Sequence, residues 1–232
     1  MAGLVEEESL TMVDPHNITD YSRNDYSLQE FLLFAPAVAG KKAVMISPKI
    51  DAFLKLGKDF VESYYGVKNP TPLKIISLLC LYHEYTHVDM LLEFMKEVKL
   101  GKYTVLRPSY AHLAMMDNDG KFDWRKVTPS QLECVNGFSF KTSRFFILHT
   151  QPNAKIGVID THILDEMIEL GFMNLITSKG YSVPTSTPQN PKVYKILEDA
   201  WLSHCDNLGV GYAEHDLNVW RRRTKTKPLQ MN

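Results

Sequence analysis

The sequence predicts an all-α fold, and three observations support this class. Apolar residues recur at helical spacing along most of the chain. Proline, N-cap and capping-box signals separate these runs, and no stretch alternates apolar and polar residues between hairpin turns. The chain has 232 residues, 44% hydrophobic and 23% charged, so it can bury a substantial core, and we expect one domain with two lobes.

The expected helices follow one another with short interruptions. Apolar periodicity and punctuation predict elements over 27–38, 49–65, 72–100, 103–116, 129–135, 141–149 and 161–170, and two more after prolines 184, 188 and 191. The 72–100 pattern is long enough to bend or break once. Ser27 and Glu30 form a capping-box pattern, Thr128 and Asp160 are expected N-caps, and Gly57 weakens its helix.

Charge is distributed unevenly, although the net charge is only −1. Residues 1–36 hold seven acidic residues and one arginine, a sum of −6, and residues 217–232 hold five basic residues and no acidic one, a sum of +5. We therefore separate an acidic segment (1–26) and a basic tail (224–232) from the helical domain (27–223). The basic end could contact phosphates, and a solvated, frayed terminus is the alternative.

Cys80, Cys134 and Cys205 are widely separated and form no C-x-x-C pair. This pattern indicates neither a disulfide framework nor a cysteine zinc site, and it favours a reducing, intracellular compartment, cytoplasmic or nuclear. No apolar run approaches the roughly 18 residues of a membrane span. We expect no membrane partner.

The hairpin 136–140, followed by a helix beginning at Lys141, has the features of a phosphate site. Its backbone N–H groups and the positive end of the helix dipole would face an anion. The same dipole disfavours an ammonium and biases the Lys141 amine toward its neutral, nucleophilic form. Most lysines in a first helical turn are simply solvated, so this pattern alone does not establish a nucleophile.

Two segments in order resemble the HhH-GPD superfamily of base-excision DNA glycosylases. The run 137–146 (GFSFKTSRFF) is similar to that family's hairpin and second helix, and 157–164 (GVIDTHIL) is similar to its catalytic-aspartate segment. The lysine and the aspartate are 19 positions apart. Segments 31–43 and 213–220 are also similar to archaeal and bacterial 8-oxoguanine glycosylase-like proteins, and the resemblance covers most of residues 27–223.

The resemblance implies a two-lobed helical fold around a central cleft and a monomeric enzyme. In the family's lysine-bearing branch the hairpin lysine is the nucleophile and the aspartate assists it, which assigns these roles to Lys141 and Asp160. The partner implied is double-stranded DNA with a damaged or modified base, 8-oxoguanine being the best guess and a modified pyrimidine an alternative. The implied activity is base excision with strand cleavage through a Schiff base, with no cofactor and no metal.

Further site residues follow from the same resemblance. Gly137, Phe138 and Ser139 are expected to bind DNA through the hairpin, and Arg144, one turn after Lys141, to contact a phosphate or to lie solvated on the surface. Asp216 and Trp220 are candidates for the base pocket, and a core tryptophan is the alternative for the latter. Ser139 replaces a glycine that is common in the family, and the cysteines of the iron–sulfur branch are missing.

Two alternatives belong to other functional classes. The run 83–87 (HEYTH) matches H-E-x-x-H, which on a helix would place His83 and His87 on one face as zinc ligands with Glu84 as general base. The extended pattern would need glycine at Met90 and histidine at Glu93. A non-catalytic helix-hairpin-helix protein, in which Lys141 only contacts phosphate, is the second alternative.

Overall fold

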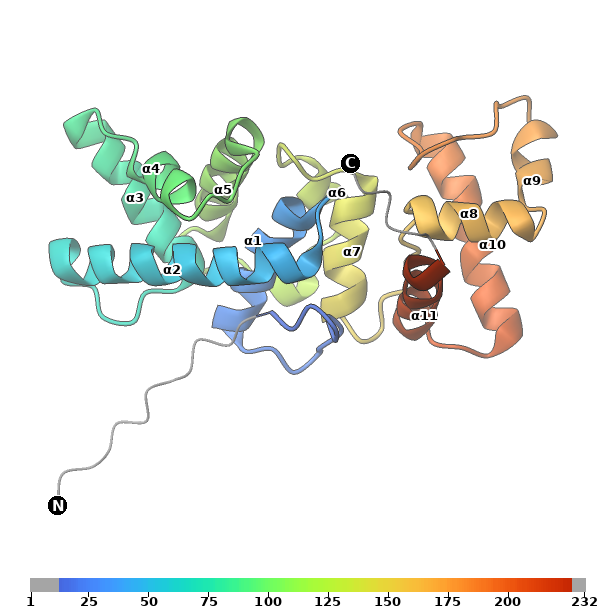
Figure 1. The fold of residues 1–232 in the computed structure, drawn as a ribbon, viewed down its shortest axis with the longest axis horizontal. Coiled ribbons are helices and arrows are strands. Elements are labelled where there is room, and N and C mark those ends of the chain that lie inside the picture. Colours follow the sequence, from blue (N-terminus) through green and yellow to red (C-terminus); the bar gives the residue numbers. More distant parts are fainter. Residues whose placement is uncertain (1–12, 227–232) are drawn as a thin grey trace, which may run out of the picture. The chain divides into compact units, whose positions relative to one another are not determined.

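The computed structural model describes residues 13–226, whose regular elements are all helices, with no strand in this range (Figure 1). The chain forms two compact units: the first comprises residues up to 18 and 22–124, and the second comprises 19–21 and the chain from 125 onward. No helix in the described range is long and apolar enough to cross a membrane. The all-α prediction is confirmed.

Among the described residues, the first unit contains five helices. They are α1 (Asp25–Val38), α2 (Ala43–Tyr65), α3 (Pro72–Thr86), α4 (Met90–Glu97) and α5 (Tyr103–Asp117). The N-cap of α1 is Asn24, whose side chain accepts a hydrogen bond from the Ser27 N–H, so the expected start at Ser27 is wrong by one turn. Helix α2 begins six residues before the predicted Lys49 and carries Pro48 in its second turn.

Gly57 has a packing role in α2, although glycine has a low helix propensity. A Cβ atom at this position would lie 2.5 Å from Cγ2 of Ile75 on α3. The absence of a side chain at glycine therefore permits the close approach of α2 and α3, at a helix-propensity cost of about 1 kcal/mol. The core around this contact includes Phe53, Leu54 and Leu79, all fully buried.

The predicted break in the 72–100 pattern occurs at His87. This residue ends α3 in the left-handed conformation (φ 61°), and Asp89 caps α4 by accepting from the Leu92 N–H. His83 is in the last turn of α3 and His87 lies beyond it, so the expected single helix carrying both histidines is wrong. Among the described residues, no three His, Cys, Asp or Glu side chains are grouped to hold a metal ion.

Up to residue 226, the second unit contains most of a 3₁₀ turn and six α-helices. They are the turn η1 (Trp124–Lys126), whose last two residues lie in this unit, α6 (Pro129–Glu133), α7 (Phe140–Thr150), α8 (Thr161–Glu169), α9 (Met173–Thr177), α10 (Pro191–Leu208) and α11 (Tyr212–Thr226). The predicted helix, hairpin and helix over 129–149 is present, with the Thr128 capping box formed in full. Asp160 caps α8 as predicted. The short helix α9 was not predicted.

A buried cluster holds α8, α9, α10 and α11 together. Its largest side chains are Trp201 and Tyr194 of α10, and Met167 of α8 and Ile176 of α9 are fully buried beside them. Residues 19–21 also belong to this unit: the Thr19 hydroxyl lies 2.8 Å from Nδ1 of the buried His149, and the Asp20 N–H donates to the His149 carbonyl. The N-terminal segment thus joins the end of α7.

Part of the basic C-terminal end is paired within the second unit. Helix α11 continues to Thr226, and its Arg222 and Arg223 form ion pairs with Glu166 of α8 at 2.6 and 2.7 Å. These pairs lower the pKa of Glu166 although burial acts in the opposite direction. Two arginines of the basic end are therefore paired within the unit. Glutamates 6–8 and Lys227 lie outside the described residues.

Candidate functional site: a lysine–carboxylate pair at two helix starts

Lys141 and Asp160 are brought together, as their spacing and the resemblance predicted. Lys141 is the second residue of α7, and Asp160 immediately precedes α8. The distance from Lys141 Nζ to Asp160 Oδ2 is 3.9 Å, and the side chains are 31% and 15% exposed. This separation is an ion pair rather than a closed hydrogen bond. The amine is therefore held near its carboxylate and remains accessible to a ligand.

The two carboxylate oxygens of Asp160 have separate contacts. Oδ1 accepts hydrogen bonds from the His162 and Ile163 N–H groups at 2.8 and 2.9 Å, which caps α8. Oδ2 is the oxygen nearer to Lys141. These hydrogen bonds fix the orientation of the carboxylate, so that Oδ1 caps α8 while Oδ2 faces the Lys141 amine.

The hairpin before Lys141 contains a glycine in a positive-φ conformation and a serine cap. Gly137 has φ 90°, which L side chains rarely adopt, whereas Ser139 has φ −87° and so requires no glycine. The Ser139 hydroxyl caps α7 by accepting from the Thr142 N–H. The first N–H groups of α7 lack intrahelical acceptors by geometry. Phe138 is 5% exposed and packs inward, so its side chain is not part of this surface.

Asp216 lies close enough to the pair to respond to both charges. It belongs to α11, is 8% exposed, and its Oδ2 is 3.6 Å from Nε2 of His149. Burial raises the pKa of Asp216 and the Asp160 charge raises it further, while His149 and Lys141 act in the opposite direction. Its carboxylate faces a buried histidine. Trp220, one turn later on α11, is 39% exposed.

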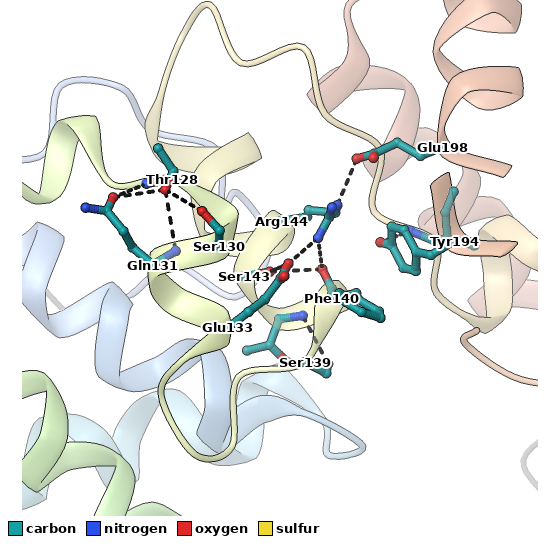
Figure 2. A network of polar contacts seen from close by, with 12 residues as sticks. Thr128, Ser130, Gln131, Glu133, Ser139, Phe140, Ser143, Arg144, Tyr194 and Glu198 are labelled. Atoms are coloured by element: carbon teal, nitrogen blue, oxygen red, sulfur yellow. Dashed lines mark hydrogen bonds and ion pairs between the residues drawn. The ribbon is translucent and has the colours of Figure 1, made fainter. Parts of the chain in front are cut away.

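Arg144 occupies a polar network inside the second unit (Figure 2). Its Nη1 lies 2.5 Å from Glu133 Oε1 of α6, and its Nε donates to Glu198 Oε1 of α10 at 2.9 Å. The guanidinium also lies over the Tyr194 ring, 4.7 Å from its centroid. Burial opposes the charge, but the Glu198 carboxylate and the hydrogen bonds raise the pKa of Arg144 overall. These contacts favour an internal role over the predicted phosphate contact.

Searches of protein-family models, curated proteins and solved structures found no match to this chain.

Several residues around the pair were not singled out from the sequence. These residues are Glu133, Glu198 and His149. Their hydrogen-bond partners lie ten or more positions away in the sequence, and no local motif marks them. One signal was available: a glutamate inside an apolar helical run, as Glu198 is in α10, is rarely buried without a cationic partner. The identity of that partner required the structure.

The arrangement combines three chemical capacities. Lys141 supplies an amine that can act as a nucleophile once it loses a proton. Asp160 supplies a fixed carboxylate that can accept this proton or stabilise positive charge developing on a bound substrate. The hairpin supplies backbone N–H groups suited to a phosphate. Together these features fit a reaction at an electrophilic carbon of a phosphate-bearing substrate.

Proposed function

We propose that this protein is a DNA glycosylase of the helix-hairpin-helix type that excises a damaged or modified base and then cleaves the strand. The observation that carries the proposal is the 3.9 Å pairing of Lys141 with Asp160. Lys141 lies at the start of the helix that follows the hairpin, and Asp160 caps the start of α8. The resemblance of segments 137–146 and 157–164 to that superfamily supports the same assignment. The proposed fold is correspondingly the glycosylase fold, with a cleft between helical lobes.

In the proposed reaction the target nucleotide leaves the base stack and enters the site. The neutral Lys141 amine attacks C1′ of the sugar, the C1′–Nζ bond forms, and the C1′–N bond to the base breaks with its electron pair leaving on the base. Asp160 accepts the proton that Lys141 releases or, as a carboxylate, stabilises the positive charge that develops on the sugar in the transition state. Ring opening gives a Schiff base, from which elimination of the 3′ phosphate cleaves the strand.

DNA is held in this proposal mainly through its backbone. The N–H groups at Gly137 and at the start of α7 bind a phosphate, and this contact carries no base specificity. Asp216 and Trp220 on α11 are the candidates for the base pocket. An oxidised purine, 8-oxoguanine first, is the proposed substrate, and a modified pyrimidine is the second choice.

A cleavage screen tests the proposal directly. Labelled duplexes that each carry one modified base, with 8-oxoguanine and modified pyrimidines among them, are incubated with the protein and resolved by size. We expect incision at one class of base, and we expect Lys141→Gln to abolish it. Lys155→Gln is the matched control, because Lys155 is an exposed lysine of the same unit that pairs with Asp206, and it should cleave normally. Duplex binding with no excision would favour the non-catalytic alternative.

The Asp160→Asn variant distinguishes a catalytic role of Asp160 from its structural role as the cap of α8. An asparagine oxygen can still accept from the His162 and Ile163 N–H groups, so the cap of α8 is kept while the charge next to Lys141 is lost. We expect turnover to fall by about 100-fold or more, as is typical for loss of acid–base assistance, with unchanged affinity for an uncleavable duplex. Parallel loss of folding and binding would contradict this role.

A further inference from the structure

Arg144 connects the helix that carries Lys141 with the elements on both sides of it. It lies one turn after Lys141 on α7, and its guanidinium contacts Glu133 of α6 and Glu198 of α10 at 2.5 and 2.9 Å. Its side chain is only 15% exposed. Glu133 Oε1 also accepts from the buried Ser143 hydroxyl at 3.1 Å. The two helices of the hairpin motif are therefore tied to each other and to α10.

Glu198 connects the same network with the segment that carries Asp160. Its side chain is 7% exposed, and its Oε1 accepts both the Arg144 Nε–H and the Gly157 N–H, the latter at 3.2 Å. Gly157 lies three residues before Asp160. A single buried carboxylate oxygen thus joins the nucleophile's helix to the backbone that leads to the carboxylate.

Tyr194, one turn before Glu198 on α10, makes a second connection of the same kind. Its hydroxyl donates to the Gly157 carbonyl at 3.1 Å and accepts from the Ile159 N–H at 3.0 Å, while its ring lies under the Arg144 guanidinium. The backbone at Gly157 is close to α10: a Cβ there would lie 3.4 Å from atoms of both Glu198 and Trp201. The segment before Asp160 is therefore fixed on α10 at several points.

We propose that Arg144 and Glu198 are positioning residues that set the separation of the Lys141 amine and the Asp160 carboxylate. This inference rests on the proposed function. The physical reason is that removal of one partner from a buried ion pair leaves the other carboxylate or guanidinium uncompensated, and the elements that it joined then shift. A displacement of about 1 Å at reacting groups can reduce a rate by about 100-fold. Arg144 then acts through geometry and not through contact with DNA.

The test measures chemistry and binding separately on the full chain. Single-turnover excision with saturating enzyme gives the rate of the chemical step on the best duplex of the screen. Titration of an uncleavable duplex over a range of salt concentrations gives the affinity and its salt dependence. For Arg144→Gln we expect the excision rate to fall by about 10- to 100-fold, with unchanged affinity and salt dependence.

Further variants keep the test decisive if Arg144→Gln folds poorly. Arg144→Lys keeps the positive charge but not the guanidinium that contacts both glutamates, so its excision rate should lie between those of Arg144→Gln and the wild type. Glu198→Gln keeps an acceptor for the Gly157 N–H and should show the same selective loss of rate. Asp199→Asn is the matched control, because Asp199 is the exposed neighbour of Glu198 on α10 and should behave as wild type.

Two results would overturn the inference. Weaker binding of Arg144→Gln with a shallower salt dependence and an unchanged rate at saturation would show that Arg144 is a phosphate contact. Wild-type rates in Arg144→Gln and Glu198→Gln would show that the network does not set the site. In both cases the wild-type protein still excises a base. A wild-type protein that excises none instead contradicts the proposed function.

Discussion

Glu30 shows how strongly burial acts on a single side chain in the first unit. It lies on α1, is 2% exposed, and its Oε2 has no hydrogen-bond partner. Burial raises the pKa of Glu30 from 4.5 to about 8, and the Asp51 carboxylate contributes in the same direction. A backbone hydrogen bond with Val13 and the charge of Arg23 oppose the shift. At neutral pH this carboxyl is therefore mainly protonated in the folded protein.

The shift gives stability a defined pH dependence. Above 4.5 the unfolded chain releases this proton while the folded protein keeps it until about 8, so Glu30 favours folding below 4.5 and this contribution is lost as the pH rises to 8. Glu30→Gln stays neutral throughout. We expect its free energy of unfolding, relative to wild type, to gain up to about 1.4 kcal/mol per pH unit between these values. Urea unfolding at pH 5 and pH 8.5 measures the difference, and equal differences at both would contradict the assignment.

Individual residues also show where reasoning from the sequence ends. The pairing of Lys141 with Asp160 could be anticipated because each lies at a helix start that local signals mark. The contacts of Arg144 could not, because Glu133 and Glu198 reach it from 11 and 54 positions away. Local pattern contains no information about such distant partners. An arginine near a proposed DNA-binding hairpin was for this reason read as a phosphate contact.

Among the helices, the prediction was most accurate where a capping side chain or a first-turn proline marks the start. Thr128 with Pro129 begins α6 and Asp160 begins α8 as expected, because these side chains satisfy N–H groups that the helix leaves open. The start of α1 was misplaced because Asn24 caps equally well one turn earlier. The beginning of α2 has no side-chain cap, and α9 has only five residues. Tertiary packing, rather than local signal, defines such elements.

The Ser139 cap of α7 matters for the site because Lys141 follows two residues later. The Ser139 hydroxyl accepts from the Thr142 N–H at 3.4 Å, and its backbone has an ordinary extended conformation. We expect Ser139→Ala to lower the free energy of unfolding by about 1 kcal/mol, and Ser139→Gly by only a few tenths. Thermal and urea unfolding of both variants check this order. Equal losses would indicate that the cap does not stabilise α7.

For the molecule as a whole, helical content and two lobes were expected from the sequence, but the boundary between the two units was not. Residues 19–21 join the second unit although the chain on both sides of them belongs to the first. The contact between Thr19 and His149 spans 130 positions, and nothing local to either residue indicates it. The ion pairs of Arg223 were missed for the same reason, since the glutamates that pair with it lie on α8. Charge sums along a chain do not reveal which charges are already paired.

Covalent trapping tests the central claim most directly, because it reports on the Lys141 amine itself. A duplex with the preferred base is incubated with the protein and sodium borohydride, which reduces a Schiff base to a stable amine, and the adduct is digested and mapped by mass spectrometry. We predict a single DNA-modified peptide with the linkage at Lys141, no adduct with Lys141→Gln, and a normal adduct with Lys155→Gln. A linkage at another residue, or an undiminished adduct with Lys141→Gln, would contradict Lys141 as the nucleophile.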